Sequence, residues 1–327
     1  MTAGSTPLWR YAAGRLVQAV PLLLGVVVVN FLLISLAPGD PVATLLGEYP
    51  APPEYIAQLR REFGLDQPAP MRLALYAWNV VRGELGFSFA YRLPVATLVA
   101  GRLGNTFLLM VTALSLAALV GVGLGVTAAR RRGSGLDTAA TGISLAGYSI
   151  PDFWLAQLLV LFFAVFLGWL PAQGIRSVRE EYTGLAAVLD TARHLILPAA
   201  ALSFRYMALI SRLTRASMLE AMSQDFILAA RARGLPERLV LLQHGLRNAA
   251  LPIVTVIGYN FAFVLAGSAL VETVFGWPGV GRLLYDAMLQ RDTPVLLGVL
   301  LMVSATVVVV NLLTDLLYAA LDPRVRY

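Results

Sequence analysis

Six apolar stretches divide the chain and set its structural class. They cover residues 16–37, 107–129, 145–170, 195–213, 251–271 and 295–321. Each is close to or longer than the roughly 20 residues that an α-helix needs to cross a bilayer. Charged side chains are rare inside these stretches and frequent between them. The pattern predicts an all-α integral membrane protein with six transmembrane helices.

Two of the polar connections are long enough to carry structure of their own. The first, residues 38–103, contains two helical patterns at 55–63 and 71–81. The second covers about 211–250, between the fourth and fifth apolar stretches. Connections of this length in folded proteins are usually functional or disordered, and helical patterns argue against disorder. We therefore expect both connections to be folded and functional.

The arginines predict how the chain is oriented in the membrane. Arg130, Arg131 and Arg132 directly follow the second apolar stretch, and six more arginines lie in the 211–250 connection. Short cytoplasmic loops are enriched in basic residues, whereas long loops cross the membrane largely regardless of charge. Both termini are therefore expected in the cytoplasm, with the 38–103 loop outside. We divide the chain into 1–103, the first helix and its extracytoplasmic loop, and 104–327, a five-helix core with an inner loop at 214–250.

Composition narrows the functional classes. The chain is 58% hydrophobic and 13% charged with a mean hydropathy of +0.73, against about 25% charged residues in soluble domains. All 25 basic residues are arginine, so the lysine of a P-loop nucleotide site is absent. There is no cysteine and there are two histidines, which argues against thiolate and multi-histidine metal sites. The net charge of +6 is explained by membrane topology rather than by nucleic acid.

The 211–250 connection has the pattern of a helical hairpin. A short helix begins near Asp225 and ends at Gly234, and a second runs from Glu237 up to the fifth apolar stretch. Glycine favours a helix end, and Pro236 suits the start of the next helix. The pattern alone fits an amphipathic hairpin on anionic lipid as well as a docking element. The small pair Ala229 and Ala230 favours docking, because small side chains allow close insertion into a partner.

A few charged and polar residues lie within or beside the apolar stretches. Ionisable groups are costly inside a bilayer and are functional candidates by default. The candidates for a pathway through the membrane are Asp152, Arg205, Asn260 and Glu272. Glu272 and Asp315 also suit a capping or interfacial role, and Asn260 suits helix packing. Asp152 and Arg205 are expected at similar depth, where an ion pair would satisfy both; alternatively, Arg205 would hold a substrate carboxylate.

Several motifs along the chain resemble one family of membrane transport proteins. They are Pro38-Gly39-Asp40-Pro41, Phe63-Gly64-Leu65, Ser149-Ile150-Pro151-Asp152, Gly168-Trp169-Leu170-Pro171, Asp225-Phe226 through Ala229-Ala230-Arg231-Ala232-Arg233-Gly234-Leu235, His244-Gly245-Leu246-Arg247-Asn248-Ala249, Glu272 through Gly281, and Asp322-Pro323-Arg324. Their order and membrane depth are similar to those of the first permease subunit of ATP-binding-cassette importers for dipeptides, oligopeptides or nickel. Leu228 departs from the general permease pattern, which has glutamate there.

The resemblance implies the fold, the partners and the place of ATP chemistry. It implies a type I importer permease fold in the bacterial inner membrane, paired with a second homologous permease. Two ATPase subunits would bind ATP and Mg²⁺, so this chain would be non-catalytic and carry no cofactor. An extracytoplasmic binding protein would deliver substrate, with the 38–103 loop helping to receive it. The implied contacts with the ATPases are Asp225, Ala229, Ala230, Arg231, Arg233, Gly234 and Glu237.

Three other functions are alternatives to the peptide permease. The same family serves nickel chelates and other small solutes, and the sequence does not choose among them. An ion-coupled secondary transporter would need an acid relay and often has internal repeats; no convincing repeat is present, and the 211–250 connection would have no role in it. An intramembrane enzyme would need catalytic side chains at a shared depth, which the chain does not present.

Overall fold

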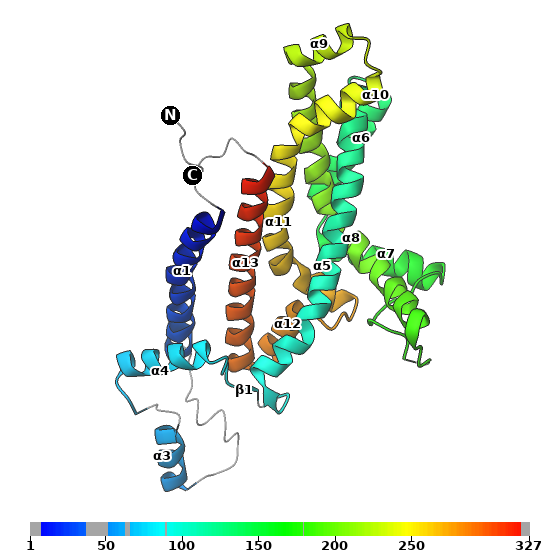
Figure 1. Ribbon diagram of the computed structural model, residues 1–327. Coiled ribbons are helices and arrows are strands. Elements are labelled where there is room, and N and C mark those ends of the chain that lie inside the picture. The colour runs from blue at the N-terminus through cyan, green and yellow to red at the C-terminus, as the bar shows by residue number, and fades with distance from the viewer. Residues whose placement is uncertain (1–7, 37–51, 63–65, 89, 179, 322–327) are drawn as a thin grey trace, which may run out of the picture.

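A computed structural model describes residues 8–36, 52–62, 66–88, 90–178 and 180–321. The motif Pro38-Gly39-Asp40-Pro41, the residues Phe63-Gly64-Leu65 and the motif Asp322-Pro323-Arg324 lie outside the described residues. The chain is a bundle of long helices (Figure 1). The longest are α1 (Leu8–Leu36), α5 (Val95–Arg130), α8 (Gly184–Met222), α11 (Arg247–Val274) and α13 (Thr293–Leu321).

The membrane-spanning helices agree with the predicted apolar stretches. Within the described residues, five helices are long and apolar enough to cross a membrane, and a bent pair brings the number to six if it counts as one span. The five segments are Gly14–Leu33, Val95–Arg130, Gly184–Met222, Glu237–Phe261 and Thr293–Thr314. The prediction of an all-α, multi-span membrane protein is therefore confirmed. The proposed division at 103/104 falls inside α5, which continues across it without a break.

The third predicted span is a broken helix. Its first half belongs to α6 (Gly135–Ser149), and its second half is α7 (Asp152–Leu159) continued by the π-helix η1 (Val160–Phe166). The two halves meet at an angle of 104°. Pro151 lies at the break; it lacks a backbone N–H and disfavours helical geometry in the residue before it. The span expected at 145–170 is therefore bent sharply at Pro151.

Close packing of α5 against α8 forms the centre of the bundle. Gly121 and Gly125 on α5 face α8, where a Cβ at position 125 would stand 2.5 Å from Cβ of Thr214. Gly147 on α6 approaches Ala208 of α8 in the same way. Small residues let helix backbones approach closely, which replaces the hydrophobic driving force that is missing in lipid. Gly121, Gly125 and Gly147 are therefore packing positions against α8.

The bundle has two distinct ends (Figure 1). At one end stand α9 (Asp225–Ala232), α10 (Glu237–Leu239) and the π-helix η2 (Val240–Leu246). At the other end lie α3 (Pro53–Glu62), α4 (Ala69–Val81), the short strands β1 (Phe87–Ser88) and β2 (Leu93–Pro94), and α12 (Val280–Gln290). We call these the α9 end and the α12 end. The helices predicted at 55–63 and 71–81 are confirmed as α3 and α4.

At the α12 end, the two strands and helix α12 are attached to the long helices of the bundle. β1 and β2 pair antiparallel, with Phe87 opposite Pro94 and Ser88 opposite Leu93. The hydroxyl of Ser88 donates to Oδ2 of Asp292 at 2.5 Å, just before α13 begins. α12 packs its buried Val280, Leu283 and Ala287 against Val95 and Val299. The connection after α4 is thereby attached to the start of α13.

Candidate functional site

The hairpin of α9 and α10 forms a small folded unit at the α9 end. Its interior consists of Ile227, Ala230 and Val240, all buried, with Met222 and Leu235 packed around them. Ala230 therefore faces the interior of the hairpin, while Ala229 is exposed. The two alanines of the predicted docking pair thus have different roles. Ala230 allows the two helices to approach each other, and Ala229 belongs to the outer surface.

A left-handed glycine makes the break between the two helices. Gly234 has φ +74°, and its N–H donates to the carbonyl of Arg231 at 2.9 Å. The N–H of Leu235 reaches back to the carbonyl of Ala230 at 3.4 Å. Glycine is the usual residue at such a helix end because any Cβ disfavours positive φ. The predicted break at Gly234 is confirmed, and α10 begins directly after Pro236.

An ion pair closes the hairpin across this break. Nη2 of Arg231 donates to Oε1 of Glu237 at 2.8 Å, and Nε donates to Oε2 at 3.3 Å. These hydrogen bonds raise the pKa of the Arg231 guanidinium above its ordinary value. Both side chains are almost half exposed, so water screens the attraction. The pair fixes the angle between the helices more than it stabilises the fold.

The outward surface of α9 is apolar at its centre and basic at its edge. Leu228 is 63% exposed and Phe226 is 39% exposed. Asp225, Ala229, Arg231 and Arg233 are exposed beside them. Exposed apolar groups rimmed by charges are typical of protein contact surfaces. The sequence motif drew attention to the alanines and missed Phe226 and Leu228 as surface residues, because the eight-residue pattern does not show which face of α9 is covered.

The hairpin is joined rigidly to two long helices. α10 passes into η2 and then directly into α11, while α9 follows α8. Gly245 of η2 lies against α8, where an added Cβ would meet Sδ of Met222 at 3.0 Å. π-Helical turns of this kind often occur at functional sites. A displacement of the hairpin would therefore be passed to α8 and α11 together.

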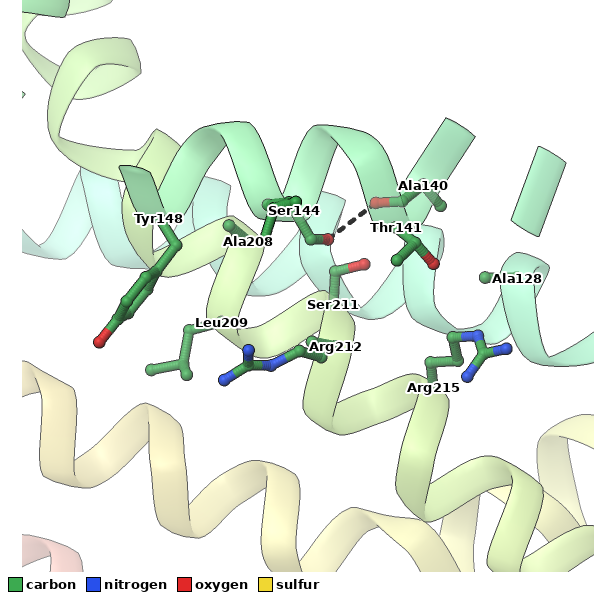
Figure 2. Close-up of a pocket in the computed structure, with 11 residues that line it drawn as sticks. Ala128, Ala140, Thr141, Ser144, Tyr148, Ala208, Leu209, Ser211, Arg212 and Arg215 are labelled. Atoms are coloured by element: carbon green, nitrogen blue, oxygen red, sulfur yellow. Dashed lines mark hydrogen bonds between the residues drawn. The ribbon is translucent and has the colours of Figure 1, made fainter. Parts of the chain in front are cut away.

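A groove between α6 and α8 has two arginines, Arg212 and Arg215, in its wall (Figure 2). It has a volume of about 360 Å³, and its wall includes Tyr148, Ser211, Arg212 and Arg215. Arg215 is held by Asp137 in a two-pronged ion pair, with Nε–Oδ1 at 2.6 Å and Nη2–Oδ2 at 2.8 Å. That pair fastens the start of α6 to α8.

The ion pair expected between Arg205 and Asp152 is not formed. The guanidinium of Arg205 lies over the ring of Tyr148 at 5.6 Å from its centroid, and Arg212 lies over the same ring at 6.0 Å. Asp152 is half-buried at the start of α7. In the part of the chain that the structure describes, neither Arg205 nor Arg212 has an acidic oxygen within 4.0 Å. The aromatic ring offers Arg205 an alternative partner through cation–π attraction.

The exposed arginines identify a face of α8 that does not suit lipid. Arg205 and Arg212 are both exposed and lie seven residues apart, which places them on one side of the helix. A guanidinium in contact with acyl chains is strongly unfavourable, so such residues face protein or a water-filled path. The α6–α8 groove is therefore the side on which a pathway or a partner subunit is expected.

Glu272 is enclosed by protein at the α12 end. Its side chain is fully buried. Oε1 accepts hydrogen bonds from Thr106 at 2.9 Å and Ser268 at 3.1 Å, and Oε2 accepts one from the N–H of Arg282 at 2.8 Å. A Cβ at Gly279 would collide with this carboxylate. In this arrangement Glu272 has no surface left for a substrate; it connects α5, α11 and the start of α12.

Neighbouring hydrogen bonds fasten the same region. The indole N–H of Trp277 donates to the carbonyl of Asn105 at 2.9 Å, and the amide of Asn105 donates to the carbonyl of Pro278 at 2.9 Å. Asn260, also buried, donates to the carbonyl of Val256 one turn earlier at 2.6 Å. The side chain of Asp315 lies outside the described residues. Among the described residues, no group of three or more His, Cys, Asp and Glu side chains could hold a metal ion.

Comparison with known proteins decides the family. The profile described as "Binding-protein-dependent transport system inner membrane component" matches residues 121–327. An N-terminal profile of the same kind of membrane component matches residues 8–110. The chain belongs to this family. It is a membrane-spanning permease subunit of the importer class.

Related proteins cover almost the whole permease. A probable peptide ABC transporter permease protein of Sinorhizobium fredii is 42% identical over 317 residues, covering 97% of this chain and 99% of the relative. The dipeptide transport system permease protein of Escherichia coli is 40% identical over 330 residues, covering 96% and 97%. The resemblance stated from the sequence motifs is thereby confirmed.

Two solved transporters share the fold of the permease. One, described as an amino acid ABC transporter with histidines, matches with a TM-score of 0.52 at 15% identity, covering 68% of this chain and 94% of that one. The MetNI methionine ABC transporter in an inward-facing conformation matches with a TM-score of 0.50 at 20% identity, covering 75% and 97%. At these identities the likeness shows the fold alone, and that fold is the type I importer fold expected from the sequence.

Proposed function

We propose that this permease forms half of a translocation pathway for peptides and is driven by separate ATPase subunits that bind the α9–α10 hairpin. The observation that carries the proposal is the outward surface of α9. Exposed Phe226 and Leu228 lie at the far end of the bundle, on a unit joined rigidly to α8 and α11. A push on this surface would tilt two spans as one body, as rigid-body switching requires.

The proposed contact includes the residues named from the motif. Asp225, Ala229, Arg231 and Arg233 lie on the exposed side of the hairpin. Gly234 and Glu237 set its shape, and Ala230 supports it from inside. We add Phe226 and Leu228 as the apolar centre of the contact. Binding of ATP and Mg²⁺ falls to the partner chains.

The pathway is assigned to the groove of α6 and α8. Arg212 and Tyr148 in its wall, and Arg205 beside Tyr148, would face the substrate. Asp152 at the start of α7 and Asn260, which is buried in α11, would support the pathway from outside the groove. A free peptide carboxylate suits a pair of arginines without acidic partners. Glu272 would act at a distance from the substrate by holding the α12 end in place.

The proposed assembly contains this permease, a second homologous permease, two ATPases and a substrate-binding protein. The α9 end, which also carries Arg130, Arg131 and Arg132 after α5, would face the cytoplasm. Both termini would then be cytoplasmic in a bacterial inner membrane. The binding protein would approach the α12 end.

Purification and reconstitution test this proposal. Affinity purification of the full chain from its native membrane should yield a second permease and ATP-hydrolysing subunits, and the chain alone should hydrolyse no ATP. Addition of the binding protein loaded with a dipeptide should raise ATP hydrolysis by the complex. A nickel chelate that stimulates the complex where di- and oligopeptides do not would favour the small-solute alternative. Uptake driven by an ion gradient without ATP would overturn the proposal.

A further inference from the structure

Helix α4 presents its apolar face away from the protein. Met71, Leu75, Trp78 and Val81 are 53%, 42%, 54% and 78% exposed. Their spacing of three to four residues places them on one side of the helix. Arg72 and Tyr76 lie on the other side and are partly covered, together with Leu73 and Val80. An amphipathic helix in water would expose polar rather than large apolar side chains on its outer side.

The contacts of α4 with α1 fix its level in the membrane. The guanidinium of Arg72 lies 5.8 Å from the ring centroid of Phe31, and the ring of Tyr76 lies 6.4 Å from it. Phe31 lies five residues before α1 ends at Leu36, which corresponds to about 7.5 Å along the helix. Interfacial helices bury their apolar side about 5–10 Å into the headgroup and acyl boundary. α4 therefore packs against α1 near the end of its apolar segment Gly14–Leu33, where an interfacial helix would lie.

The apolar side of α4 lies next to an exposed apolar surface of α1. α1 crosses the membrane, and its Val29, Leu32 and Leu33 are exposed next to Phe31 at 54%, 48% and 50%. In Figure 1, α4 lies across the end of α1. The chain after α4 is tied at the same end to the start of α13, through Ser88 and Asp292. Contacts with α1 and with the start of α13 thus hold α4 across the end of the bundle.

The charges of α4 suit an interface between lipid and water. Residues 69–81 contain no aspartate or glutamate. The guanidinium of Arg82, just after the helix, stands 4.8 Å above the ring of Trp78. Tryptophan and arginine are enriched where a membrane meets water, because each has an apolar body and a polar end.

We propose that α4 is an interfacial helix whose stripe of Met71, Leu75, Trp78 and Val81 is immersed in the lipid at the α12 end. Arg82, directly after the helix, would reach the phosphate groups. The attachment of α4 to α1 and of the following chain to α13 would hold both helices at a fixed level relative to the bilayer surface. The sequence alone suggested that this loop receives a binding protein. For α4 the exposed side of four large apolar side chains, without an acidic residue in the helix, favours lipid as the occupant.

Site-directed spin labelling tests the inference on the full chain in its complex. The chain has no cysteine, so Leu75→Cys and Trp78→Cys each create a single labelling site. The complex with the unsubstituted chain gives the background from other subunits. In vesicles of phosphatidylethanolamine and phosphatidylglycerol, collision of the label with oxygen reports lipid, and collision with a water-soluble nickel chelate reports water.

Two matched positions calibrate the result. Leu33→Cys on α1 marks lipid, and Val178→Cys, where the native side chain is 99% exposed in the loop before α8, marks water. We expect labels at 75 and 78 to have an oxygen-to-chelate collision ratio severalfold above that at 178 and near that at 33. A ratio equal to that at 178 would overturn the proposal in favour of a water-facing helix. Protection from both reagents would overturn it in favour of a protein partner.

Discussion

Arg231 and Glu237 are joined across the turn at Gly234, with Nη2 of the arginine 2.8 Å from Oε1 of the glutamate. The pair bridges the end of α9 and the start of α10. It joins the two helices on the outer side of the hairpin, whose interior is held by Ile227, Ala230 and Val240. Because the hairpin leads into α8 on one side and α11 on the other, its opening angle affects how a push is transmitted.

Removal of this pair should weaken coupling more than stability. Glu237→Gln should change the free energy of unfolding by less than about 1 kcal/mol, because the pair is solvent-screened. The double exchange Arg231→Glu with Glu237→Arg should restore part of the lost coupling. Substrate-stimulated ATP hydrolysis and thermal unfolding, measured on the same preparations, check both parts. A loss of stability of several kcal/mol in Glu237→Gln would contradict this account.

Gly234 should tolerate asparagine better than valine. An L-residue in left-handed geometry costs about 1–2 kcal/mol, and asparagine is among the residues that adopt it most readily. Since no atom lies within 4 Å of an added Cβ, the effect comes from the backbone alone. Gly234→Val should uncouple ATP hydrolysis from transport, and Gly234→Asn should keep most of the coupling.

Gly133 provides the control for this backbone effect. It has a similar φ of +77°, empty surroundings and a place in another turn, between α5 and α6. Gly133→Val should therefore carry a similar backbone cost without uncoupling. Equal uncoupling by both valine variants would show that the hairpin has no special role.

The two faces of α5 should respond differently to added volume. Gly125→Ala places a Cβ against Thr214 and the carbonyl of Ser211, whereas Gly123→Ala meets no atom within 4 Å. Overpacking typically costs about 1–3 kcal/mol, so Gly125→Ala should lower the unfolding temperature in detergent and Gly123→Ala should not. Similar unfolding temperatures for the two variants would contradict the close α5–α8 contact.

Glu272 should be needed for the α12 end to remain attached. Glu272→Ala leaves the hydroxyls of Thr106 and Ser268 and the N–H of Arg282 without their shared acceptor. Each buried group left unsatisfied costs about 1–3 kcal/mol. Protease should then cleave the segment around 275–291 faster than in the unsubstituted chain. Asp286→Asn, which alters only a 3.8 Å contact with Arg282, is the matched control and should leave the rate unchanged.

Local sequence signals predicted the parts of the fold that depend on neighbouring residues. The length of each apolar stretch predicted the membrane spans. The conformational freedom of glycine predicted the break at Gly234. Pro151 predicts a disturbance in the third span, but the angle of 104° depends on how α6 and α7 pack against other helices. The shared ring contact of Arg205 and Arg212 with Tyr148 was not expected, because Asp152 offers an opposite charge at similar depth.

Long-range contacts account for what the sequence left open. Glu272 and Thr106 are 166 residues apart, so their hydrogen bond cannot be read from spacing. The amphipathic pattern of α4 was correct, but such a pattern does not say whether the apolar side meets protein or lipid. That choice became visible only when Arg72 and Tyr76 were found against Phe31.

The most direct test of the proposed coupling site is a crosslink from α9. In the purified complex, Leu228→Cys treated with a short cysteine-to-amine reagent should link this permease to an ATP-hydrolysing subunit. Val178→Cys, in the loop before α8 at the α12 end, should form no such link. A link from position 178 and none from position 228 would contradict the assignment of the α9–α10 hairpin as the ATPase contact.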